Sequence, residues 1–232
     1  MRLLLEEVTY ARGLFSLAVE GEFCEGIHLL NGPVGSGKST FALLAAGLIR
    51  PDSGMRKADG LDRVMLSMQF PEYHVTGFTL GEEARTWGLD PGMVMKRANL
   101  PGMENTDLSK LSRGELKRFE LSCALSGSYD LLILDEPFSA LDCREKQIIS
   151  RALEQRKEGV TIVITHEGLH LPRVDWIWEL ESGRLTDLGA VPGAIGRWRF
   201  APPHIRELVD SGVIPENISV RDVLEAGCRI PV

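Results

Sequence analysis

Polar and apolar residues alternate over the first part of the chain, and short runs of purely apolar residues appear in its second half. Alternation with period two predicts strands with one exposed face, whereas uninterrupted apolar runs are typical of buried parallel strands. On these grounds strands are expected at 2–8, 14–21, 26–31, 62–69, 131–135 and 160–165, and helices at 39–49, 117–125 and 143–155. Strands alternating with helices predict a layered α/β core.

Two segments depart from this alternation. Between about residues 70 and 127, Gly and Pro separate short helical pieces, which indicates a helical subdomain inserted into the core. After about Asp187 the chain becomes loop-rich and then offers two short amphipathic helices, at 204–212 and 219–227. We therefore expect one unit over residues 1–187 and an accessory tail over residues 188–232.

Composition narrows the class of protein. The chain has 232 residues, 44% of them hydrophobic, and a net charge of −7, which argues against a protein that coats nucleic acid. Its four cysteines are scattered, so buried reduced thiols in a cytosolic protein are favoured over disulfides or zinc. The chain shows no N-terminal signal pattern and no apolar run near the roughly 20 residues that cross a bilayer. Such a chain is not expected to span a membrane, although it could dock on a protein that does.

The stretch GPVGSGKS, residues 32–39, fits GxxxxGK(S/T) and lies between an expected strand and an expected helix. Glycines allow backbone N–H groups to curl around phosphates, and the helix N-terminus adds its dipole. Lys38 is expected to reach the β- and γ-phosphates, and Ser39 is expected to hold Mg²⁺. The candidate nucleotide-binding residues here are Gly32, Gly35, Ser36, Gly37, Lys38, Ser39 and Thr40.

LLILDEP, residues 131–137, is an apolar strand that ends in two carboxylates. Asp135 can orient Mg²⁺, and Glu136 can take the proton of an attacking water. The alternative is that both acids merely cap the next turn. His166 ends the strand VTIVIT, one helix and one strand later; a single His there is usually structural, and its spacing from Glu136 is what points to a role.

Together with Gln69, LSRGE (111–115) and SALD (139–142), these motifs resemble, in order and spacing, those of the ABC transporter ATPases over about residues 1–187. The resemblance implies an α/β P-loop NTPase cassette. It would have a mixed, RecA-like core sheet, N-terminal antiparallel strands, an inserted helical subdomain over about 70–127 and a short C-terminal helical tail. It further implies ATP hydrolysis with ATP and Mg²⁺, with Glu136 and His166 as catalytic residues and Ser39, Gln69 and Asp135 as metal ligands.

Ser112 alone would be an ordinary helix cap. The resemblance makes LSRGE the signature loop, which faces the phosphate loop of a second cassette, so that Ser112 and Gly114 touch the γ-phosphate held by the partner. It also matches Tyr10 to the aromatic residue that stacks on adenine. Arg113 stands where the family has Gly; it either points away as a surface residue or weakens the composite site. Glu115 replaces the usual Gln, and Val34 is a mild change in the phosphate loop.

FPEYHV after Gln69 and the tail segment 201–225 resemble the energy-coupling factor (ECF) ATPases, which drive uptake of vitamins or metal ions. That resemblance implies a peripheral protein on the cytoplasmic face of the membrane, with a transmembrane coupling subunit and a substrate-binding membrane subunit. It favours a heterodimer of ATPases over a homodimer, with the tail as a candidate dimerisation segment and no nucleic acid as partner.

Other functions stay open. One is a soluble ABC ATPase of a non-transport system, acting in iron–sulfur assembly or on DNA or ribosomes. Another is a different ABC importer class, and a third is a module that binds ATP without turnover, against which Glu136 and His166 argue. A GTPase is disfavoured because no NKxD motif follows the phosphate loop. The transported substrate is not expected to be encoded in this chain.

Overall fold

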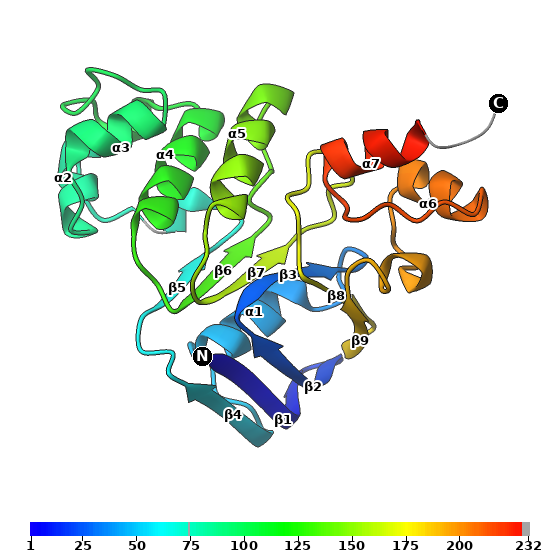
Figure 1. Cartoon of the computed structure of the whole chain (residues 1–232). Helices are drawn as coiled ribbons and strands as arrows, with labels where there is room; N and C mark the ends of the chain where they lie inside the picture. Colours follow the sequence, from blue (N-terminus) through cyan, green and yellow to red (C-terminus); the bar gives the residue numbers. More distant parts are fainter. Residues whose placement is uncertain (74, 229–232) are drawn as a thin grey trace.

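The computed structural model describes residues 1–73 and 75–228. Within them one sheet runs in the order β4-β1-β2-β9-β8-β3-β7-β6-β5 (Figure 1). Its strands are β1 (Arg2–Arg12), β2 (Phe15–Cys24), β3 (Gly26–Asn31), β4 (Ser53–Asp59), β5 (Val64–Ser67), β6 (Leu131–Asp135), β7 (Val160–Ile164), β8 (Trp176–Glu181) and β9 (Arg184–Ala190). The expected strands are all present, and β4, β8 and β9 are additional.

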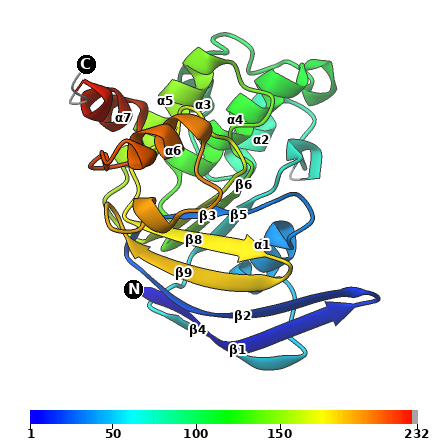
Figure 2. The same ribbon diagram turned by 90° about the vertical axis from the view of Figure 1, so that its right-hand side faces the viewer.

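The sheet has two parts. The strands β8, β3, β7, β6 and β5 run parallel to one another, whereas β9 pairs antiparallel with β8, and β1 pairs antiparallel with both β2 and β4. Figure 2 shows β8 and β9 between β3 and the antiparallel strands β1, β2 and β4. The mixed sheet and the N-terminal antiparallel strands expected from the sequence are therefore confirmed. Because parallel strands end at one edge, residues that follow β3, β6 and β7 come together.

Two buried clusters cover the two faces of the parallel strands. Side chains alternate along β6: Leu131 and Ile133 belong to the cluster that also holds Phe41 of α1 (Lys38–Ala46). Leu132 and Leu134 belong to the opposite cluster, which receives α4 (Arg113–Ser126) and α5 (Cys143–Glu154). Helices therefore cover both faces, as the continuous apolar strands predicted.

The inserted subdomain has a small core of its own. It comprises η1 (Pro71–Tyr73), α2 (Leu80–Thr86), α3 (Pro91–Arg97), η2 (Leu108–Lys110) and α4, seen at the upper left of Figure 1. Its buried side chains include Leu80, Val94 and Phe119. The helical character expected for residues 70–127 is therefore present. Of the FPEYHV stretch, His74 lies outside the described residues.

The C-terminal segment packs on the same side of the sheet as α5 (Figure 1). It contains η3 (Ile195–Arg197), α6 (Pro203–Asp210) and α7 (Val220–Gly227). Trp198 and Ile205 lie in the same buried cluster as Leu132 of β6, so this segment shares a core with the rest of the chain. Among the residues that the structure describes, no helix combines the length and the apolar character needed to cross a membrane.

Candidate active site

The loop between β3 and α1 is shaped by glycines. Gly37 takes a left-handed conformation (φ 106°) and forms the N-cap of α1, with no side chain capping the helix. A Cβ at Gly32 would lie 2.0 Å from the Leu180 carbonyl oxygen, so only glycine fits against β8 there. The Ser36 hydroxyl is buried and has no hydrogen-bond partner among the described residues. Open helix N–H groups and an unpartnered hydroxyl in one loop form a cradle for an anion.

Lys38 opens α1 and is buried, with 8% of its surface exposed. Its Nζ donates to the carbonyl oxygens of Gly32 and Pro33 at 2.8 and 2.9 Å. Burial lowers the pKa of Lys38, while the charges of Glu136 and Asp135 act in the opposite direction. Its ammonium is therefore fixed across the loop at the start of α1.

Two acids lie at the C-terminal end of β6, as expected: Asp135 is its last residue, and Glu136 follows it. Burial raises the pKa of Asp135, against which the hydrogen bond from Ser39 and the charges of Lys38 and Lys117 act. The backbone of Glu136 is left-handed (φ 50°), a conformation that non-glycine residues adopt infrequently. Its amide donates to Ile164 O at 2.8 Å, and this holds the residue against the end of β7.

The Glu136 carboxylate is held by the residues that follow β7. Thr165 Oγ1 donates to Oε2 at 3.0 Å, and the His166 amide donates to Oε1 at 3.1 Å. His166 Nδ1 lies 2.6 Å from Oε1, while more than half of its side chain is exposed. The carboxylate is thus oriented by an imidazole that faces the open side of the site.

These groups line one pocket, which we call the phosphate-loop pocket, with a cavity volume of about 320 Å³. Its walls are Phe15, Val34, Gly35, Gly37, Lys38, Ser39, Thr40, Gln69, Asp135, Glu136 and His166. Most of the site residues expected from the sequence are therefore brought together. Gly32 and Ser36 belong to the phosphate loop but do not line the pocket, and neither do Tyr10, Ser112 and Gly114.

The aromatic residue in this pocket is Phe15, which sequence reasoning missed. A Cβ on Gly37 would lie 2.8 Å from the Phe15 ring, so the ring packs against the phosphate loop. Tyr10 instead lies beneath Arg12, whose guanidinium carbon is 4.6 Å from its ring centroid. Tyr10 does not line this pocket, and its stacking on adenine stays a prediction. Strand alternation places Phe15 on the face of Leu17 and Val19, and that signal was available in the sequence.

The LSRGE segment forms the start of α4. Ser112 is the N-cap and accepts from the Glu115 amide, while Glu115 accepts from the Ser112 amide at 2.9 Å, which completes a capping box. Arg113 occupies the first helical position without a positive φ. A Cβ on Gly114 would lie 3.0 Å from the Ala140 carbonyl oxygen, so the SALD segment packs closely against α4.

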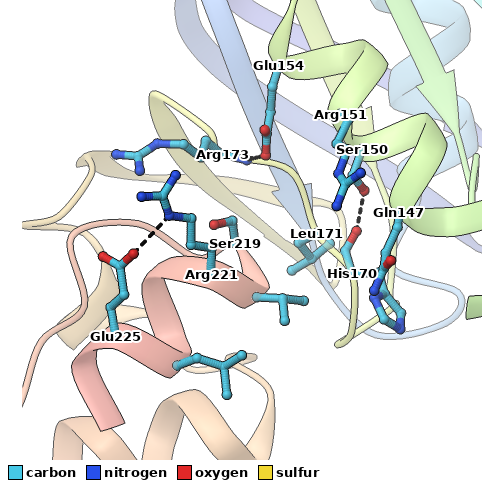
Figure 3. A pocket seen from close by; sticks show the side chains of 12 residues that line it. Gln147, Ser150, Arg151, Glu154, His170, Leu171, Arg173, Ser219, Arg221 and Glu225 are labelled. Atoms are coloured by element: carbon cyan, nitrogen blue, oxygen red, sulfur yellow. Dashed lines mark hydrogen bonds and ion pairs between the residues drawn. The ribbon is translucent and has the colours of Figure 1, made fainter. Parts of the chain in front are cut away.

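A second pocket, of about 560 Å³, lies between α5, the loop after β7 and α7 (Figure 3). Arg173 and Arg221 meet acids here: Arg173 pairs with Asp222, and its amide donates to Glu154, while Arg221 pairs with Glu225. None of the site residues expected from the sequence, all of which lie in the described part of the chain, lines this pocket. This pocket lies where the C-terminal segment packs against α5.

The phosphate-loop pocket also fits a divalent cation. The Ser39 hydroxyl and the Asp135 carboxylate are within hydrogen-bonding contact, and Gln69 lines the same wall. Hydroxyl, carboxylate and amide oxygens are the ligands that Mg²⁺ takes in nucleotide sites. The residues present are therefore those that would hold Mg²⁺ beside a bound nucleotide.

Comparison with known proteins agrees with this geometry. Residues 23–139, about half of the chain, match the family model described as ABC transporter. The sulfate/thiosulfate import ATP-binding protein CysA 2 of Chromobacterium violaceum is 31% identical over 90% of this chain, which spans 62% of that protein's length. The molybdate/tungstate import ATP-binding protein WtpC of Archaeoglobus fulgidus is 29% identical over 91% of this chain and 92% of its own length.

Among solved structures, the dimeric post-hydrolysis state of the ATP-binding cassette MJ0796, bound to ADP and Pi, superposes with a TM-score of 0.68. It is 22% identical and covers 80% of this chain and 98% of its own, a likeness that supports the fold. With the phosphate loop, the two acids at the end of β6 and His166 around one pocket, the chain belongs to the ABC transporter family and has the fold of its ATP-binding cassette.

Proposed function

We propose that this chain is the ATP-binding and ATP-hydrolysing subunit of an ABC importer and works as a dimer beneath a membrane protein. The observation that carries the proposal is the convergence of Lys38, Asp135, Glu136 and His166 on the phosphate-loop pocket. An anion cradle next to an oriented carboxylate is what hydrolysis of a nucleoside triphosphate requires.

Each residue has a role that follows from its position. The open N-terminus of α1 and Lys38 bind the phosphates, and Phe15 offers an aromatic face to the nucleotide beside the loop. Glu136 takes a proton from the attacking water, and His166 and Thr165 keep its carboxylate in place. Mg²⁺, when bound through Ser39, Asp135 and Gln69, would neutralise charge on the phosphates.

The dimer follows from the family relationship. Ser112 and Gly114 do not line the phosphate-loop pocket of their own chain, so a role at the γ-phosphate requires a second cassette. We favour a heterodimer, in which only one of the two composite sites uses LSRGE. The segment after residue 187, through α6 and α7, is a candidate for contacts between the two ATPases.

The membrane partner is proposed to bind next to Gln69. Phe70 and Tyr73, whose ring centroids lie 5.9 Å apart, expose 38% and 72% of their surface at η1, and Phe78 exposes 85% further along the segment, whereas Pro71 is buried. Exposed aromatic clusters are typical of protein contacts. Because FPEYHV and the tail resemble ECF ATPases, we propose an ECF-type importer of a vitamin or metal ion, peripheral to the cytoplasmic face of the membrane.

A second candidate is an importer of oxyanions, favoured by the names of the sulfate/thiosulfate and molybdate/tungstate relatives. Identification of the membrane proteins that co-purify with the chain separates the two. An ECF coupling subunit supports the first candidate, and a sulfate- or molybdate-type permease supports the second. Replacing Tyr73 and Phe78 by Ser should release the membrane subunit without changing MgATP affinity.

Hydrolysis is tested with Glu136→Gln, measured against Glu158→Gln, which changes an exposed acid outside the site. The first variant should bind MgATP normally and hydrolyse it roughly 10²–10⁴-fold more slowly, the usual contribution of a positioned base. The second should behave as the parent chain. Near-native turnover in Glu136→Gln would place the general base elsewhere.

A further inference from the structure

Two side chains of α4 reach the segment that carries Gln69. Arg113 and Lys117 are four residues apart, so they project from the same face of the helix. Lys117 contacts the residue before Gln69, and Arg113 contacts residues after it. Gln69 itself lines the phosphate-loop pocket. The start of α4 and one wall of the nucleotide site are therefore joined within a single chain.

Lys117 binds the backbone just before Gln69. Only 1% of its surface is exposed, and its Nζ donates to the Met68 carbonyl oxygen at 2.9 Å and to Glu120 Oε2 at 3.2 Å. Glu120 is also buried, at 3% exposure. A buried ammonium that loses an acceptor pays a desolvation penalty, so this lysine resists separation of Met68 from α4.

Arg113 contacts side chains just after Gln69. Its guanidinium carbon lies 4.9 Å from the centroid of the Phe70 ring, and its Nε lies 3.8 Å from Glu72. The pair with Glu72 is more than half exposed and therefore weak by itself. Stacking of a guanidinium on a ring adds to it, and Lys cannot replace this planar group.

We propose that Arg113 and Lys117 are positioning residues that make the Gln69 segment move together with α4. The proposal rests on the proposed function, because it links the nucleotide that Gln69 faces to the signature that serves the opposite site of the dimer. In this proposal Arg113 has a structural role within its own chain. Arg113 contacts Phe70 and Glu72, which lie next to the surface proposed above to bind the membrane subunit.

The contact is tested first by hydrogen exchange of the full chain, which needs neither nucleotide nor partner. The variants are Arg113→Gln and the double change Lys117→Met with Glu120→Gln, which removes both buried charges together so that neither is left without its counterpart. The amide of Tyr73, which donates to Phe70 O at 3.2 Å, should exchange about 10-fold faster in each. The Glu115 amide, in the capping box, should keep its rate, and Lys110→Ala should change neither. Unaltered exchange at Tyr73 in both variants would overturn the proposal.

The second test measures whether both residues act through Gln69. In the parent chain each variant should lower kcat for MgATP about 3–10-fold at unchanged KM. In a Gln69→Ala background the same changes should have no further effect, because residues that act through one group are not additive. A loss of equal size in that background would show damage unrelated to Gln69 and would refute the proposal. Absence of ATPase activity in the parent chain would instead count against the proposed function, and the exchange result would still decide the contact.

Discussion

The helices α1 and α4 begin in opposite ways. The N-cap of α1 is Gly37, and no side chain satisfies the first N–H groups of this helix. The N-cap of α4 is Ser112, which forms a reciprocal capping box with Glu115. An open N-terminus is ready for an anion, whereas a capped one already has an internal acceptor. The phosphate loop is thus preorganised to bind an anion. The start of α4 would have to give up its capping hydrogen bond to Ser112 before it could bind a phosphate of the partner.

The surroundings of the two helices differ in the same sense. The loop before α1 is fixed by β3, in the middle of the main sheet, and by the close approach of Gly32 to Leu180. The start of α4 belongs to a subdomain with a separate, small core and depends on side-chain contacts. Backbone geometry therefore determines the first site, and side chains determine the second.

Lys38→Ala should give the largest difference between the two helix starts. The variant should lose MgATP affinity by roughly 100-fold, because hydrogen bonds to charged groups are each worth roughly 1.5–3 kcal/mol. In the isolated monomeric chain, Ser112→Ala should bind MgATP as the parent does, because Ser112 does not line its own phosphate-loop pocket. Isothermal titration of the two variants measures both, and equal losses would remove the distinction between the helix starts.

Glu83→Gln should loosen the subdomain of α4 and leave the phosphate loop intact. Burial alone raises the pKa of Glu83, but hydrogen bonds from Gly77, Trp87 and Thr76 outweigh it, so the pKa lies below its ordinary 4.5. Since the folded pKa is depressed, this carboxylate stabilises the fold above about pH 4.5, and its contribution is lost as the pH falls through the folded value.

The variant should therefore lower the free energy of unfolding by about 1–3 kcal/mol at pH 7, since an amide cannot accept all of these bonds. It should also be less sensitive than the parent chain to acid below pH 4.5. Urea denaturation at several pH values measures both effects, and MgATP affinity at pH 7 serves as the control. Parallel acid limbs for parent and variant would contradict this account of Glu83.

Ser112→Ala should cost about 1 kcal/mol of stability, the usual value of an N-cap side chain. Ser112→Thr retains a hydroxyl acceptor and should stay within a few tenths of the parent value. Chemical denaturation of the three chains measures the difference. If Ser112→Ala were as stable as the parent, Ser112 would not act as a cap.

Glu115→Gln should have the smallest effect and the opposite sign. Gln preserves a capping box, so the helix start is retained while a negative charge next to the signature is removed. In the proposed dimer, ATPase activity should rise about 2–3-fold, in line with the 0.2–1 kcal/mol of exposed charge pairs, and the gain should shrink with added salt. A salt-independent loss of activity would mean that the carboxylate is needed at the composite site.

Sequence reasoning succeeded where one residue type alone satisfies the backbone or the chemistry. The phosphate loop, Asp135, Glu136 and the strand that delivers His166 are of this kind, and the structure joins them in one pocket. It failed where packing between distant segments decides. The edge strand β4 carries Arg56 and Lys57 and lacks apolar alternation, because only one of its sides pairs with another strand. Phe15 packs against Gly37, and Arg113 stacks on Phe70, although the residues of each pair lie far apart in the sequence.

The position of β3 has a consequence for biosynthesis. Its neighbours in the sheet are β7 and β8. Residues 26–31 therefore cannot pair in the sheet until residues 160–164 and 176–181 have been synthesised. Contacts of such long sequence separation slow folding and leave strand edges unpaired meanwhile. The phosphate loop, encoded near the start of the chain, should become competent to bind ATP only once nearly four-fifths of the protein has left the ribosome.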